Sequence, residues 1–150
     1  MRNSPVAAAV VVSFAALGLT GCGGGGDNTE AAGRPAVTTL PDCAPQATPV
    51  AVPEGFPETF PLPRGAVVRE ARDDGKTMNV EAVVPGEIRD VAKSLIDGLP
   101  QAGFDLGEGD SEEHEAESHF TGNGFAGFFK LNTVGGCGGA NTLAVVLTRS

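Results

Sequence analysis

The stretch Ile88-Arg89-Asp90-Val91-Ala92-Lys93-Ser94-Leu95-Ile96-Asp97-Gly98-Leu99 decides the fold of this chain of 150 residues. Its apolar residues recur three or four positions apart, the spacing that gathers side chains on one face of an α-helix. Acids around its first turn suit a helix start, and Pro100 followed by Gly103 predicts its end. We assign the apolar face to the core and give it no chemistry. That face consists of Ile88, Val91, Ala92, Leu95, Ile96 and Leu99.

Strand patterns surround this helix. Asp74-Gly75, between residues 66–72 and 77–84, predicts a β-hairpin. A strict two-residue turn would place Arg69 opposite Val80 on the apolar face, so we expect a longer turn. Further strands are predicted at 113–120, 125–132 and 141–148, where apolar residues follow strand spacing or run together. The expected fold class is α+β, an antiparallel sheet in the order β-β-α-β-β-β along the chain, with one amphipathic helix packed on one face.

The amino terminus carries an export signal. Residues 6–19 form an apolar run interrupted only by Ser13 and Gly18, shorter than the roughly 20 residues that a spanning helix needs. The run ends in Leu19-Thr20-Gly21-Cys22, which resembles the lipobox of bacterial lipoproteins. The resemblance implies that residues 1–21 are a signal peptide, that a diacylglyceryl group joins the Cys22 thiol, and that the new amine often receives an acyl chain such as palmitate. The alternative is an ordinary secretory signal with an incidental cysteine.

The cysteine count follows from that resemblance. Once Cys22 is acylated, Cys43 and Cys137 remain, and an exported chain enters an oxidising compartment. We therefore predict a disulfide between them that fixes the start of the domain to a late loop. Two free or metal-binding thiols are the alternative, and the lack of a Cys-x-x-Cys spacing argues against a redox-active pair.

Composition divides the rest of the chain into three parts. Residues 22–40 are rich in glycine and polar residues and predict a flexible tether. Prolines recur through residues 41–64, which predicts an extended, stiff segment. Residues 65–150 are predicted to form a single α+β domain. The side chains expected to anchor the proline-rich segment onto that domain are Phe56, Phe60 and Leu62.

Three short runs carry a second resemblance. They are residues 56–65 (FPETFPLPRG), 99–104 (LPQAGF) and 115–122 (EAESHFTG). Together they resemble a small, uncharacterised lipoprotein domain found in actinobacteria, over about residues 43–150. The resemblance implies the fold and an extracytoplasmic location, and it brings no known activity.

Charge excludes one class of partner. The chain has 10 lysines and arginines against 19 acids, for a net charge of −9. No basic patch is available to neutralise phosphates, so nucleic acid is excluded as a natural partner. The lack of Trp and Tyr also removes the best residues for stacking on bases or sugars.

The sequence contains no convincing motif for catalysis or nucleotide binding. Gly122, Gly124 and Gly127 spell GxGxxG, but a strand follows where a dinucleotide site needs a helix. A hairpin with glycines for tight turning or close packing is the better interpretation. None of the serines of the exported chain lies in a GxSxG motif, so we predict no hydrolase.

Acidic residues suggest a cation site, which we weigh against a solvated strand face. The spacing does not match an EF-hand, and His114 and His119 differ by an odd number, so they point to opposite faces of one strand. We therefore predict no metal site and no cofactor. The residues that come nearest to a metal site are Glu115, Glu117 and His119. The whole acidic cluster is Asp105, Glu108, Asp110, Glu112, Glu113, Glu115 and Glu117.

These observations predict a lipoprotein on the outer face of the cell membrane. Lipid on Cys22 would attach it to the membrane, and the domain would act as a non-enzymatic binding or envelope-interaction module toward an envelope protein or a small ligand. The alternative is a carrier of a divalent cation on the acidic strand, or of a small apolar ligand in a groove between the helix and Phe125, Phe128 and Phe129. An enzyme would need catalytic groups that converge from unrelated loops.

Overall fold

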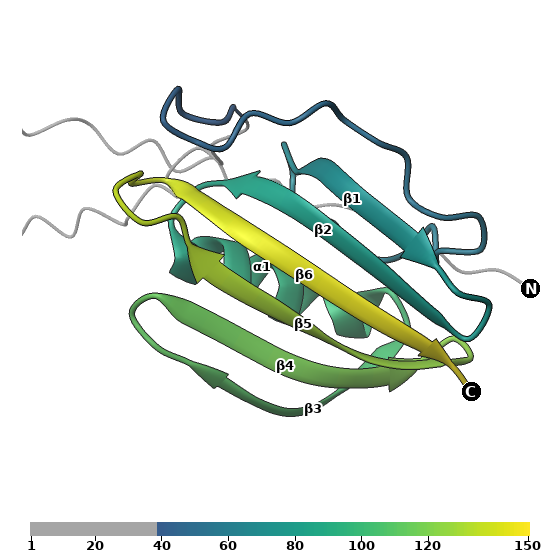
Figure 1. Cartoon of the computed structure of the whole chain (residues 1–150). Helices are drawn as coiled ribbons and strands as arrows, with labels where there is room; N and C mark the ends of the chain where they lie inside the picture. The colour runs from purple at the N-terminus through teal and green to yellow at the C-terminus, as the bar shows by residue number, and fades with distance from the viewer. Residues whose placement is uncertain (1–38) are drawn as a thin grey trace, which may run out of the picture. The chain divides into compact units, whose positions relative to one another are not determined.

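The computed structural model describes residues 39–150. They form a six-stranded antiparallel sheet with one helix packed against one face, which confirms the predicted α+β class and adds one strand to it (Figure 1). The predicted signal peptide, Cys22 and almost all of the tether lie outside the described residues. The elements are β1 (Val67–Asp73), β2 (Thr77–Pro85), α1 (Ile88–Gln101), β3 (Phe104–Ser111), β4 (Glu115–Gly122), β5 (Phe125–Thr133) and β6 (Ala140–Arg149).

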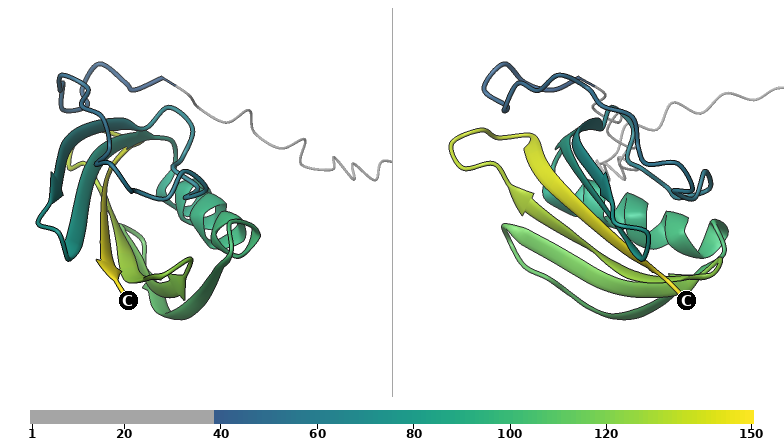
Figure 2. Two further views of the ribbon diagram at one scale, coloured as in Figure 1. Left: turned by 90° about the vertical axis from the view of Figure 1, so that its right-hand side faces the viewer. Right: turned by 45° about the vertical axis from the view of Figure 1, so that its right-hand side comes forward.

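The strands lie in the order β1-β2-β6-β5-β4-β3, and every neighbouring pair is antiparallel. The last strand, β6, therefore lies between the two hairpins β1-β2 and β4-β5. The connection from β2 to β3 contains α1, which crosses the sheet, and the sheet curves around the helix (Figure 2). We call the face that carries α1 the inner face and the other one the outer face. This arrangement leaves β1 and β3 as edge strands.

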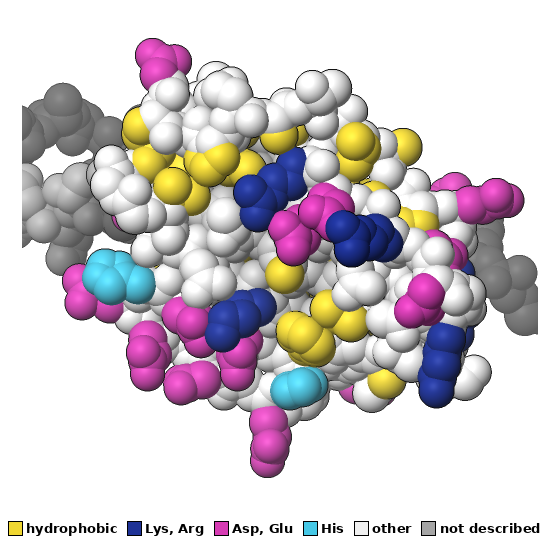
Figure 3. All heavy atoms as spheres, in the orientation of Figure 1, with side chains coloured by type: hydrophobic (Ala, Val, Ile, Leu, Met, Phe, Trp, Pro, Cys, Tyr) yellow, Lys and Arg dark blue, Asp and Glu magenta, His cyan; other side chains and the backbone are white. Residues whose placement is uncertain are grey.

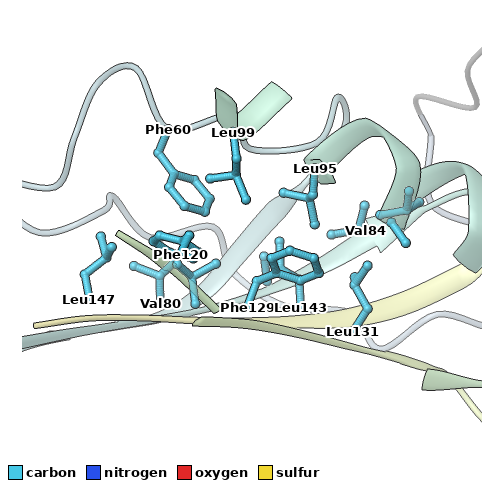
Figure 4. Close-up of a cluster of buried hydrophobic side chains, with 14 of the residues drawn as sticks. Phe60, Val80, Val84, Leu95, Leu99, Phe120, Phe129, Leu131, Leu143 and Leu147 are labelled. Carbon is cyan, nitrogen blue, oxygen red and sulfur yellow. The ribbon is translucent and has the colours of Figure 1, made fainter. Parts of the chain in front are cut away.

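The core lies between α1 and the inner face. Leu95 and Leu99 are fully buried and point from the helix onto the sheet (Figure 4). Ile96, which the helical pattern placed on the same face, is 39% exposed, because it lies at the margin of the apolar face. The buried strand residues beneath the helix include Val80, Val84, Ala116, Phe120, Phe129, Leu131, Leu143, Val145 and Leu147.

The helix passes through Pro100 and ends at Gln101, two residues before the predicted stop at Gly103. Proline is tolerated there because Pro100 lies in the last turn, where its missing N–H removes one hydrogen bond and the chain leaves the helix directly afterwards. Gly103 has a φ of +86°, the left-handed conformation that glycine adopts after a helix. The Asn123 side chain in the β4-β5 turn donates to the Ala102 carbonyl at 2.8 Å and so covers the helix end.

The β1-β2 turn is shifted by one residue from the predicted Asp74-Gly75. The Asp74 N–H donates to the Thr77 carbonyl, which leaves Gly75 and Lys76 as the two central residues. Gly75 has a φ of +89°, as a glycine at the first central position requires. The expected longer turn is therefore not needed. Ala71 lies opposite Val80 and a bulge at Arg69 restores the inward pattern.

The additional strand is β3, which sequence reasoning left as a charged connection. Seven of its eight residues are exposed, and only Phe104 is buried. A register shift between Leu106 and Gly109 further breaks its alternation. It therefore lacks the apolar alternation by which strands are recognised, and it forms because its backbone pairs with β4.

Residues 41–64 form a strap that runs beside β1 and reaches α1 (Figure 1). Phe56 and Phe60 are buried in the core and Leu62 packs against it, which confirms the three predicted anchors. The strap is not one extended run, because hydrogen-bonded turns begin at several prolines. These turns close between Pro41 and Ala44, Pro53 and Phe56, Pro57 and Phe60, and Pro63 and Ala66.

Cys43 and Cys137 form the predicted disulfide. It joins the beginning of the strap to the loop between β5 and β6, and Cys137 belongs to a small second apolar cluster. That cluster covers Val83 on the outer face, so this end of the sheet is packed on both faces. The other buried members of the cluster are Ala44 and Ala140.

Candidate functional site

A cleft of about 840 Å³ lies at one end of the sheet, where the start of α1 meets two loops. Its walls come from residues 86–90, the β3-β4 loop at 113–114, and residues 133–141 between and within β5 and β6. These segments lie together at the left of Figure 1. The volume falls within the range that holds small organic ligands.

The glycine-rich loop of the cleft, residues 134–139, consists of two consecutive turns. The Cys137 N–H donates to the Val134 carbonyl, and the Ala140 N–H donates to the Cys137 carbonyl. Gly136 and Gly139 have φ values of +74° and +78°, conformations that other residues rarely adopt. Because Cys137 stands between the two turns, the disulfide to the strap fixes the middle of this wall.

Two segments that line the cleft have backbone N–H groups without a partner among the described residues. The N–H groups of Gly135, Gly136 and Gly138 donate to no other described residue, nor do those of Ile88 and Arg89 in the first turn of α1. Glu87, at the N-cap position, makes no side-chain hydrogen bond that would satisfy them. Unsatisfied N–H groups at a helix start bind carbonyl, carboxylate or hydroxyl oxygens of a ligand.

One buried side chain lines the cleft with an acceptor. Asn141, at the start of β6, is 1% exposed, and its Nδ2 donates to the Gly86 carbonyl at 2.8 Å. That bond fixes the orientation of the amide, because Oδ1 could not face a carbonyl. Within residues 39–150, Oδ1 accepts no hydrogen bond. Every fully buried side-chain nitrogen or oxygen of residues 39–150 has a hydrogen-bond partner, so Oδ1 retains some exposure and can accept a hydrogen bond from a ligand or water in the cleft.

Acidic side chains dominate the rim of the cleft. The exposed acidic residues there are Glu87, Asp90 and Glu113. The basic or titratable residues are Arg89 and His114. The rim therefore favours a ligand with positive charge, while the backbone donors beneath it favour oxygen acceptors.

The three residues nearest to a predicted cation site lie elsewhere. Glu115, Glu117 and His119 share the outer face of β4, as their spacing predicted. Lys130 on β5 lies between the two carboxylates, with Nζ 2.8 Å from Glu115 and 3.6 Å from Glu117. The hydrogen bond to Glu115 is the largest cause that raises the pKa of Lys130. A lysine ammonium thus holds the position that a cation would take. Acidic side chains gather at the lower left of Figure 3.

His119 is not drawn into this ion pair. Its ring lies against Phe128, with centroids 5.8 Å apart, and both residues border a shallow hollow of about 210 Å³ on the outer face. His114 lies outside β4, on the rim of the cleft, so the two histidines belong to different surfaces. Among residues 39–150, no group of three or more His, Cys, Asp and Glu side chains is placed to hold a metal ion.

The apolar groove expected between the helix and three phenylalanines does not form. Phe128 and Phe129 are neighbours on one strand, so they point to opposite faces of the sheet. Phe129 is buried beneath α1, and Phe125 packs against the same core. Phe128 lies on the outer face, where His119 contacts it.

The GxGxxG match lies in a β-hairpin, which was the interpretation preferred over a dinucleotide site. Gly122, Asn123 and Gly124 form the β4-β5 turn with positive φ values. Gly127 allows close packing, because a Cβ there would overlap the carbonyl oxygen of Val146 and meet the ring of Phe120 at 3.1 Å.

Sequence reasoning missed Asn141. The signal was present, because Asn141 stands two residues before Leu143 on the inward face of the predicted strand, alternating with Val145 and Leu147. A polar residue at an inward position marks either a structural hydrogen bond or a site. In Asn141 the amide nitrogen makes the structural hydrogen bond to Gly86, and the amide oxygen is left for the site.

No family model, curated protein or solved structure matches the chain. The resemblance to actinobacterial lipoproteins stays a prediction, as does lipidation at Cys22, which lies outside the described residues. In residues 39–150, no helix has the length and hydropathy needed to cross a membrane.

Proposed function

We propose that the chain is a lipid-anchored, extracytoplasmic binding module without enzymatic activity. In this proposal Cys22 carries the lipid, residues 22–40 form the tether, and the cleft beside the disulfide faces a ligand or an envelope partner. The Gly- and polar-rich tether would hold the domain away from the membrane surface.

The observation that carries the binding function is the cleft with Asn141 in its wall. Pockets that bind ligands combine a concave surface with a small number of fixed polar groups. Here the fixed groups are the Asn141 amide and the backbone N–H groups of the glycine-rich loop.

Two features support the other parts of the proposal. The Cys43–Cys137 disulfide is typical of proteins in oxidising compartments, which agrees with export. The buried polar side chain of the described cleft is an amide, which neither ionises nor attacks a substrate, so it favours binding over catalysis.

Membrane attachment is tested with the full chain and a Cys22→Ala variant, both produced in a bacterium that processes lipoproteins. We expect the full chain in the membrane fraction with an intact mass that begins at Cys22 and includes the lipid. The variant is expected in the soluble exported fraction. A membrane-fraction chain that retains residues 1–21, or an unmodified Cys22, would contradict the proposal.

Binding is tested in the same cells with a photoreactive side chain at His114, on the cleft rim, or at Gln101, at the other end of α1. Both positions are exposed, so the substitutions are matched in their effect on folding. We expect crosslinked products from position 114 only. Equal crosslinking from both positions, or none from either, would contradict a binding role for the cleft.

A further inference from the structure

The cleft offers hydrogen-bond donors and an acceptor side by side. The donors are backbone N–H groups of the glycine-rich loop and of the first turn of α1, and the acceptor is Oδ1 of Asn141. A simple anion would satisfy the donors and leave Asn141 without a partner. A bare cation would satisfy Oδ1 of Asn141 and leave the backbone N–H groups without a partner. It would also be repelled by the positive end of the helix dipole.

A polypeptide satisfies both sets of groups. Its carbonyl oxygens accept from backbone N–H groups, and its own N–H groups donate to an amide oxygen, in alternation along the chain. The cleft volume of about 840 Å³ lies in the range of pockets that hold drug-sized ligands, and a tripeptide is of that size.

The charge of the rim adds a preference among peptides. Three exposed carboxylates, on Glu87, Asp90 and Glu113, outnumber the single arginine, Arg89. Complementary potential across an interface favours the partner of opposite sign and speeds its association. A second copy of this chain, with its net charge of −9, is disfavoured for the same reason.

We propose that the cleft at the start of α1 binds a short, extended, basic peptide segment, whose backbone pairs with the glycine-rich loop and Asn141 and whose cationic side chain meets Glu113. This inference rests on the proposed binding function and deepens it, because it names the chemical class of the partner. Residues 133–141 and 86–90 supply the backbone contacts, and the disulfide at Cys137 holds the loop ready for them.

The test uses the full oxidised chain, labelled with nitrogen-15, titrated with trilysine, trialanine and triglutamate and followed by amide NMR. We expect trilysine to shift the amides of Gly135, Gly136, Gly138 and the Asn141 side chain. Trialanine should shift the same signals at higher concentration, and triglutamate should shift none of them. Trilysine shifts confined to β3, or equal responses to trilysine and triglutamate, would overturn the inference.

Two matched variants separate the cleft from the acidic surface. Glu113→Gln removes one negative charge from the rim, and Asp110→Asn removes one from the exposed edge strand β3. We expect Glu113→Gln to weaken trilysine binding about two- to fivefold, the range for a partly exposed ion pair, and Asp110→Asn to leave it unchanged. Equal effects of the two variants would overturn the inference.

Asn141→Ala tests the acceptor itself and is expected to weaken all peptide binding by about tenfold or more. If this variant does not fold, the Glu113→Gln comparison decides the question without it. A chain that carries lipid on Cys22 and crosslinks a partner from position 114, yet shows no peptide-induced shifts in the cleft, would refute this inference and leave the proposed function standing.

Discussion

Cys43 and Cys137 lie 94 positions apart in the sequence, and their Cα atoms are 5.5 Å apart across a disulfide. The bond connects the strap to the glycine-rich wall of the cleft, so one covalent link serves both the fold and the site. Cys137 also packs in the apolar cluster over Val83.

Removal of this disulfide should cost much of the stability of the domain. In the chain-entropy model a loop of this length contributes about 4–5 kcal/mol, because the link restricts the unfolded chain. The double variant Cys43→Ala/Cys137→Ala is expected to unfold at a far lower urea concentration. Cys22→Ala, which leaves the disulfide intact, is the control and should match the unmodified domain. An unchanged urea midpoint in the double variant would contradict the predicted role.

The apolar face of α1 can be tested with two adjacent residues. Leu95 is fully buried and Ile96 is 39% exposed, although the sequence places both in the apolar stripe. Leu95→Ala should lower the unfolding free energy by about 3–5 kcal/mol, because it removes contacts and leaves a cavity. Ile96→Ala should lower it by less than about 1 kcal/mol. Similar losses for the two variants would mean that the helix is rotated from its described position.

Gly127 and Gly135 form a second matched pair. A Cβ at Gly127 would overlap the backbone oxygen of Val146 on β6, whereas a Cβ at Gly135 would meet no atom within 4 Å. Gly127→Ala is therefore expected to destabilise the sheet by about 2–4 kcal/mol through forced separation of two strands. Gly135→Ala should be neutral, or stabilising by under about 1 kcal/mol. Thermal unfolding of both variants makes the comparison, and a neutral Gly127→Ala would contradict the pairing of β5 with β6.

Acid should weaken the link between the β1-β2 turn and the C-terminal strand. The hydrogen bonds from Arg149 and from the Gly75 N–H lower the pKa of Asp73 from 3.8 to about 2. Because the pKa is lowered in the folded state, the carboxylate stabilises the fold above pH 4, and that stabilisation is lost as the pH falls toward 2.

Urea unfolding of Asp73→Asn and the unmodified chain at several pH values measures this effect. The difference in unfolding free energy between them should be largest near pH 5 and should shrink as the pH falls to 2. Arg149→Gln, which removes the partner, should show the same convergence. A difference that stays constant from pH 5 to 2 would show that Asp73 acts through packing rather than charge.

The sequence was most informative in segments where apolar residues recur with the period of a helix or of a strand. The stripe from Ile88 to Leu99 and the alternation around Val80 and Leu143 predicted the helix, the sheet and the faces they bury. These elements are recognisable because burial imposes a period on the side chains.

Elements held by backbone contacts were harder to predict. Strand β3 pairs through its backbone and exposes nearly every side chain, so nothing in its composition distinguishes it from a loop. The turn at Gly75 shifted by one residue because the Asp74 carboxylate accepts from the N–H groups of Lys76 and Thr77, which competes with the expected turn.

The site could be predicted only in part for the same reason. Cys43 and Cys137 were paired because few cysteines were available, but most of the cleft wall consists of backbone groups, which carry no side-chain signal. The apolar groove was expected because Phe128 and Phe129 were grouped by type. Strand geometry sends them to opposite faces.

Native mass spectrometry of the full chain, extracted from its own membranes and compared with its denatured mass, tests the central claim most directly. The denatured mass should begin at Cys22, include the lipid, and be two hydrogens lighter for the Cys43–Cys137 disulfide. The native mass should exceed it by that of a bound peptide or protein, and Asn141→Ala should reduce this excess. A chain that begins at Met1, carries no lipid and has equal native and denatured masses would contradict a lipid-anchored binding module.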